Sequence, residues 1–113
     1  MSTVEARALV FRVASDPALL NRLASVADRG ESDPTACAEL ARMVAELDAN
    51  VSLADCVAVR PEFERATTIA TLHAAHPAVD HAAIAQVASA QNATDALAWM
   101  KRAAFACANI CSA

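Results

Sequence analysis

Apolar and polar residues recur with a helical period along the first half of the chain. The pattern is clearest over residues 17–29, where one side of a helical wheel is apolar and the opposite side is polar or charged. The same period indicates helices over residues 4–14 and over 34–47. In the segment 17–29 the apolar side consists of Leu19, Leu20, Leu23, Val26 and Ala27, and the polar side of Asn21, Arg22, Ser25, Asp28 and Arg29.

Four prolines mark the boundaries between these segments. Proline is tolerated at the first position of a helix and disrupts its interior, so each proline predicts a helix start. An aspartate stands before two of the prolines as a candidate N-cap, and the single glycine, Gly30, is a candidate C-terminal cap. The prolines are Pro17, Pro34, Pro61 and Pro77, and the aspartates are Asp16 and Asp33.

The two helices that begin with these aspartates share the string D-P-x-x-x-x-x-L-A. Two such 17-residue units make only one helix pair, whereas helical solenoids repeat whole pairs. A bundle is therefore the better description. The rest of the chain predicts a short helix capped by Ser52 and ended by Pro61, a helix from Pro61 to just before Pro77, and helices over 78–91 and 93–111.

We therefore predict an all-α fold, a compact bundle of about five to seven short helices with residues 1–113 in one domain. Composition agrees, because the chain has 31 alanines and one glycine. A GC-rich bacterial genome would account for abundant alanine, but not for scarce glycine. Only 29 residues are Val, Ile, Leu, Met, Phe or Trp. So thin a core favours a partner surface or a homodimer.

The charge of the chain argues against several classes of function. The formal net charge is −4, and Lys101 and Arg102 are the only adjacent basic pair, so nucleic-acid binding and a helix-turn-helix regulator are disfavoured. No apolar run is long enough to cross a membrane. Glu5, Arg7 and Arg12 interrupt the place where a signal peptide would be apolar, which predicts a cytoplasmic protein with four reduced cysteines.

The last predicted helix carries an aromatic residue out of pattern. Phe105 falls among the polar residues Lys101, Arg102 and Asn109, opposite the apolar side of the helix. One interpretation is that a neighbouring helix or a chain terminus covers Phe105. The other is that Phe105, with Lys101, Arg102 and Asn109, anchors a protein partner or a second copy of the chain. The apolar side holds Leu97, Trp99, Met100, Cys107, Ile110 and Cys111.

A metal site is the alternative chemistry. His73 and His76 are three residues apart and Cys107 and Cys111 four apart, spacings at which side chains on one helix can share a zinc or copper(I) ion. Pro77 weakens this hypothesis because it predicts a helix break beside His76, and His81 faces another way. The competing interpretation is that the cysteines are small core residues and that one histidine is packed while the others lie at a turn or on the surface.

The sequence contains no motif of a known catalytic site and none for a cofactor. One glycine is too few for a phosphate-binding or dinucleotide-binding loop. The leading prediction is therefore a small acidic helical module that binds another protein, as an adaptor, a regulator, a secretion chaperone or an immunity-type inhibitor does. The alternative is a metal-binding helical bundle.

Overall fold

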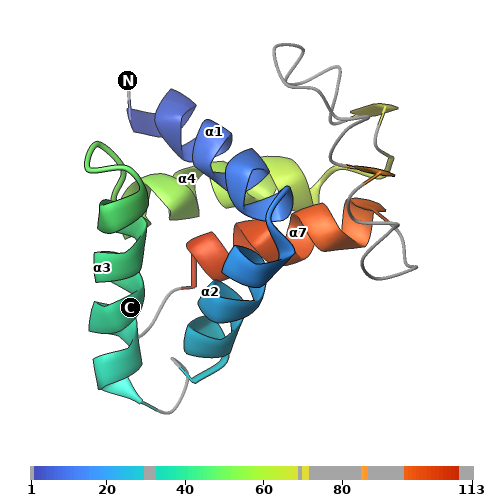
Figure 1. Ribbon diagram of the computed structural model, residues 1–113. Coiled ribbons are helices and arrows are strands. Elements are labelled where there is room, and N and C mark those ends of the chain that lie inside the picture. The colour runs from blue at the N-terminus through green and yellow to red at the C-terminus, as the bar shows by residue number, and fades with distance from the viewer. Residues whose placement is uncertain (1, 30–32, 69, 72–84, 87–95, 110–113) are drawn as a thin grey trace.

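The computed structural model describes residues 2–29, 33–68, 70–71, 85–86 and 96–109. These residues form five α-helices and no strand, which confirms the prediction of an all-α bundle. The helix predicted over 78–91 lies outside the described residues except for 85–86, and residues 69 and 72–76 of the helix predicted from Pro61 to Pro77 also lie outside them. Residues 65–68 of that second helix are described and are not helical. The helices are α1 (Ser2–Ala14), α2 (Pro17–Arg29), α3 (Pro34–Leu47), α4 (Leu53–Glu64) and α7 (Ala96–Cys107) (Figure 1).

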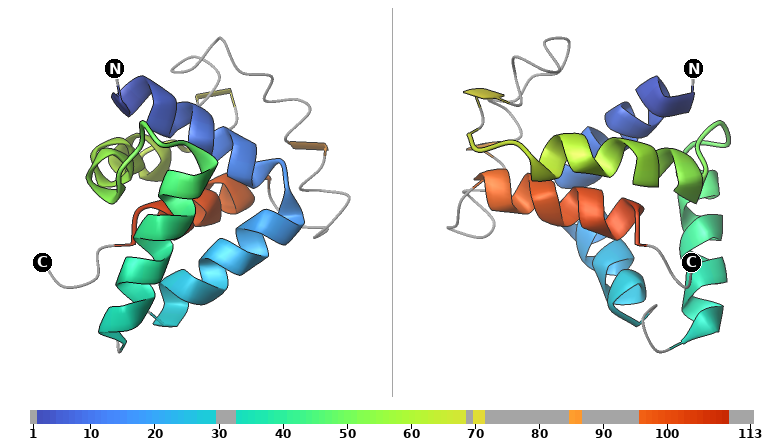
Figure 2. Two further views of the ribbon diagram at one scale, coloured as in Figure 1. Left: turned by 60° about the vertical axis from the view of Figure 1, so that its left-hand side comes forward. Right: turned by 180° about the vertical axis from the view of Figure 1, so that it is seen from behind.

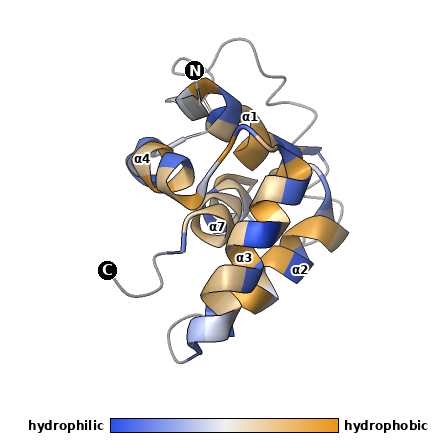
Figure 3. Cartoon of the chain, turned by 90° about the vertical axis from the view of Figure 1, so that its left-hand side faces the viewer, coloured by the Kyte–Doolittle hydropathy of each residue, from blue (hydrophilic) through white to orange (hydrophobic). Residues whose placement is uncertain are grey.

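Helix α7 lies at the centre of the arrangement. It packs against α1, α2 and α4, whereas α3 packs mainly against α2 (Figure 2). Figure 3 shows polar and apolar residues alternating along the helices around α7. Eight of the twelve residues of α7 are buried, and four of these are alanines, whose small side chains let several helices approach one. The buried residues are Ala96, Leu97, Trp99, Met100, Ala103, Ala104, Ala106 and Cys107.

Two side chains near α7 hydrogen-bond to the ends of other helices. The Trp99 Nε1 donates to the carbonyl oxygen of Ala14, and the Asn109 Nδ2 donates to that of Ala27, both at 2.7 Å. These carbonyls belong to the last turns of α1 and α2, where no helical N–H remains to pair with them. Trp99 and Asn109 thus fix α7 against both helices while satisfying buried acceptors.

The prediction that Asn109 lies on an exposed polar arc is wrong. Only 5% of Asn109 is exposed. Helix α7 ends at Cys107, so the angular spacing of a helical wheel does not extend to residue 109. Beyond the helix, the backbone turns the amide side chain inward to α2.

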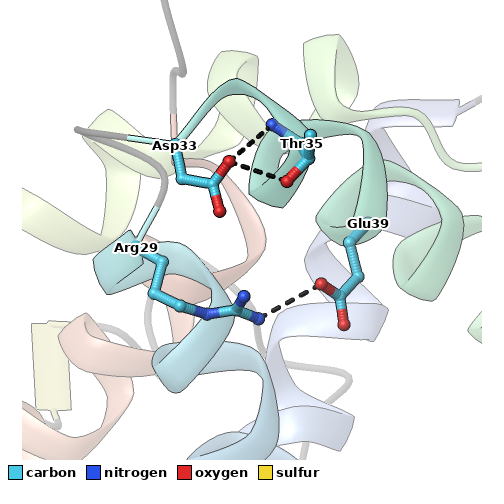
Figure 4. A network of polar contacts seen from close by, with 4 residues as sticks. All are labelled: Arg29, Asp33, Thr35 and Glu39. Carbon is cyan, nitrogen blue, oxygen red and sulfur yellow. Dashed lines mark hydrogen bonds and ion pairs between the residues drawn. The ribbon is translucent and has the colours of Figure 1, made fainter.

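Capping side chains set the predicted helix starts. Asp16 Oδ1 accepts from the Leu19 N–H, and Asp33 Oδ1 accepts from both the N–H and the hydroxyl of Thr35. Both hydrogen bonds from Thr35 lower the pKa of Asp33, and the one from the hydroxyl has the larger effect. An ion pair of 3.1 Å between Arg29 and Glu39 links α2 to α3 beside this cap (Figure 4).

The predicted cap of the next helix is also confirmed. The Ser52 hydroxyl accepts from the Asp55 N–H, and the Asp55 carboxylate accepts from the Ser52 N–H. This reciprocal pair is a capping box, which satisfies two backbone donors at the start of α4.

The prediction that one helix ends and another begins at Pro61 is wrong, because α4 continues through Pro61 to Glu64. Proline inside a helix removes one hydrogen bond and crowds the preceding turn. Contacts with other parts of the fold hold the last turn of α4, which follows Pro61. Glu62 forms a two-pronged ion pair with Arg7 of α1, with both N–O distances at 2.8 Å, and Phe63 is fully buried.

We expect Pro61→Ala to raise the free energy of unfolding by about 2 kcal/mol. Alanine restores the hydrogen bond to the Val57 carbonyl and removes the crowding, a gain of about 3 kcal/mol that is partly offset by greater freedom of the unfolded chain. The matched control is Pro34→Ala, at the start of α3, where no helical hydrogen bond is lost to proline. Urea unfolding measures the free energy of unfolding of both variants. A Pro61→Ala variant no more stable than Pro34→Ala would contradict this account.

Candidate functional site

Phe105 lies on the outer side of α7, beside α4. All four aromatic residues of the chain are described, and Phe105 is the one that is not buried: it is half-exposed and packs against the edge of the core. The Cζ of Arg60, from α4, stands 4.9 Å from the centre of the Phe105 ring, within the range of a cation–π contact. The Nε of Arg60 also donates to Oε1 of Glu64 at 2.7 Å, one turn further along α4.

Two further cations neighbour Phe105 on its own helix. Lys101 precedes it by four residues and Arg102 by three, spacings that place side chains next to each other on a helix surface. Lys101 is half-exposed and Arg102 exposed, and neither forms an ion pair with any described residue. Here we call Arg60, Glu64, Lys101, Arg102 and Phe105 the Phe105 surface.

The Phe105 surface differs in charge from the rest of the molecule. It has three cationic side chains and one carboxylate, a formal charge of +2, on a chain whose net charge is −4. The described contacts neutralise one of the three cations, Arg60. An anionic group that approached Phe105 would therefore meet two cations with no ionic partner.

The structure brings together three of the four predicted partner-binding residues. Phe105, Lys101 and Arg102 adjoin one another, whereas Asn109 is buried against α2. Arg60 of α4 lies over the Phe105 ring while the side chain stays partly exposed, so both interpretations of Phe105 stay predictions.

Sequence reasoning missed Arg60 and Glu64. Their spacing of four residues is the signal of an ion pair along one helix. The expected break at Pro61 assigned them to two different helices and hid that signal.

No protein-family model, curated protein or solved structure matches the chain significantly. The functional argument therefore depends on the geometry and charge of the Phe105 surface.

The cysteines only partly follow the prediction of four reduced thiols. Cys56 and Cys107 are free and fully buried, but Cys37 is disulfide-bonded. Spacing along a chain does not fix which sulfur atoms meet in space, so the sequence carried no signal for this bond. Cys111 lies outside the described residues.

Most of the predicted metal ligands lie outside the described part of the chain, so the metal site stays a prediction. His73, His76, His81 and Cys111 lie outside it, and the Cys, Asp and Glu side chains within it form no cluster of three suited to a metal ion. Burial, with a smaller contribution from Cys56, raises the pKa of the Cys107 thiol.

We expect both buried thiols to resist modification in the native protein. Burial, and secondarily the charge of Asp55, raises the pKa of Cys56 to about 11 from an ordinary value of 9.0. The folded chain thus keeps this proton to higher pH than the unfolded chain does. The contribution of Cys56 to the free energy of unfolding should be constant below about pH 9 and fall as the pH rises towards 11.

The measurement combines urea unfolding at pH 8 and pH 10.5 with the rate at which a thiol reagent labels Cys56 and Cys107. Slow labelling at pH 8 that becomes fast in urea is expected. Rapid labelling of either residue in the folded protein, or a stability that does not decrease above pH 9, would contradict the burial of these thiols.

No helix among the described residues has the length and apolar character that crossing a membrane requires.

Proposed function

We propose that this chain is a small helical module that binds another protein, and that the Phe105 surface receives an acidic segment of that partner. The observation that carries the proposal is a formal charge of +2 around a half-exposed aromatic ring, on a chain with a net charge of −4. Aromatic and arginine side chains are enriched at the centres of protein interfaces, where each combines apolar area with a polar contact.

Charge complementarity favours an acidic protein segment as the occupant. Lys101 and Arg102 have no ionic partner among the described residues, so carboxylates of the partner would gain contacts without displacing any there. A nucleic acid would be repelled by the remainder of this acidic chain and would find only a few cations. The proposal therefore names a protein partner with Asp or Glu residues near an apolar side chain.

A homodimer remains a prediction, with less support than a different partner. Obligate dimers usually join through large apolar faces. Val4, which is 57% exposed, is the one large apolar side chain that is mainly exposed among the described residues. Those residues thus offer a polar interface, of the kind found in complexes that form and dissociate.

The first test is the mass of the purified chain in solution, together with the proteins that it retains from a cell extract. We expect a retained protein that is lost with Phe105→Ala while the far-ultraviolet circular dichroism is unchanged. The matched control is Leu19→Ala on α2, another half-buried side chain packed against the core. A strict monomer that retains nothing would contradict the proposal, and so would equal retention by both variants.

A further inference from the structure

Arg60 makes two contacts at once on the Phe105 surface. Its guanidinium lies over the Phe105 ring at 4.9 Å, and its Nε is bound to the Glu64 carboxylate at 2.7 Å. The ring fixes the position of the guanidinium, and the carboxylate occupies one of the positions at which the guanidinium binds an oxygen anion. Arg60 is thus already arranged as a carboxylate-binding group.

From this geometry we infer that Arg60 is the residue that recognises a partner carboxylate, and that Glu64 is a built-in competitor for the same site. Phe105 then acts as a platform that positions Arg60. This inference depends on the proposed function, since it concerns the same surface and the same acidic partner. It adds that Arg60 selects the partner and that Glu64 limits how tightly the partner binds.

The competitor is held weakly enough to be displaced. The Arg60 and Glu64 side chains are 26% and 50% exposed, so water screens their ion pair. Pairs of this kind along an exposed helix contribute little to stability, and a partner that brings several carboxylates can replace one of them. Arg7–Glu62, by comparison, is a two-pronged pair between α1 and α4 and serves the fold.

The experiment uses the full chain, labelled with nitrogen-15, and a capped peptide of six glutamates as the probe. The signal of the Arg60 Nε–H reports its acceptor directly in nuclear magnetic resonance spectra. We expect this signal and the amides of residues 60–64 and 101–105 to shift on titration. A capped peptide of six glutamines should produce no such shifts.

Two substitutions distinguish competition by Glu64 for Arg60 from a general effect of the net charge on binding. Glu64→Gln should strengthen binding of the probe by about two- to five-fold, the range of one exposed ion pair. Glu46→Gln, an exposed glutamate of α3 without an ion pair among the described residues, makes the same change in net charge and should alter binding by less than about 1.5-fold. In an Arg60→Lys background the gain from Glu64→Gln should disappear, because lysine keeps the charge but not the planar donor group.

The outcomes distinguish this inference from the proposed function. If the probe shifts residues 101–105 but Glu64→Gln has no effect, or its gain persists with Lys at position 60, the inference is overturned and the acidic-partner proposal stands. If the probe causes no shifts in the wild type or in Glu64→Gln, both are overturned.

Discussion

We expect Phe63→Ala to lower the free energy of unfolding by about 3–5 kcal/mol, which is the usual loss for a large aromatic removed from a core. Phe63 is fully buried and packs on Phe11, with ring centres 5.3 Å apart and an angle of 60° between the rings. Its loss leaves a cavity between α1 and α4. It also loosens the last turn of α4, which continues beyond Pro61 because of contacts such as this one.

The matched control is Phe105→Ala, the same chemical change on the surface. Phe105 is half-exposed, and its neighbour Arg60 can turn to water, so this variant should lose only about 1 kcal/mol. Urea unfolding followed by circular dichroism compares them. Equal losses would mean that Phe105 belongs to the core, and the proposed interaction surface would then lose its central residue.

Trp99→Ala should cost a similar amount, about 3–5 kcal/mol, for two reasons that can be separated. The substitution removes a large side chain from the centre of the bundle, and it leaves the Ala14 carbonyl without its donor. Trp99→Phe keeps most of the apolar volume but lacks the N–H. It should therefore lose less, about 1–3 kcal/mol, most of it from the unpaired carbonyl.

Circular dichroism is again the probe, because Trp99 is the only tryptophan and its variants lose the intrinsic fluorescence signal. If Trp99→Phe were as stable as the wild type, the hydrogen bond to Ala14 would have no role in joining α1 to α7. If Trp99→Ala were no less stable than Trp99→Phe, α7 could not be the central packing element described above.

The sequence predicts those parts of the fold that local chemistry decides. Asp16 before Pro17 and Asp33 before Pro34 signal helix starts through bonds between neighbouring residues, and both are observed. Pro61 shows where that reasoning fails. The helix passes through it because Glu62 and Phe63 are held by α1, and contacts between distant segments leave no mark in local periodicity.

The candidate site was only partly predictable for the same reason. Lys101, Arg102 and Phe105 lie on one helix, so their spacing was enough to group them. Arg60 comes from another helix, and its position over the ring depends on how α4 packs against α7. Asn109 was misplaced because the sequence gives no sign that α7 stops at Cys107.

The most direct test of the account is the affinity of the retained partner for two charge-reversal variants, Arg102→Glu and Arg22→Glu. Both arginines are exposed and lack an ion pair among the described residues, and both substitutions change the net charge equally, but Arg22 lies on α2. The account predicts that Arg102→Glu weakens binding by about tenfold, because reversing an interface charge juxtaposes like charges, while Arg22→Glu changes it by less than about twofold. Equal effects of the two substitutions, or tighter binding by Arg102→Glu, would contradict the assignment of the Phe105 surface as the binding site.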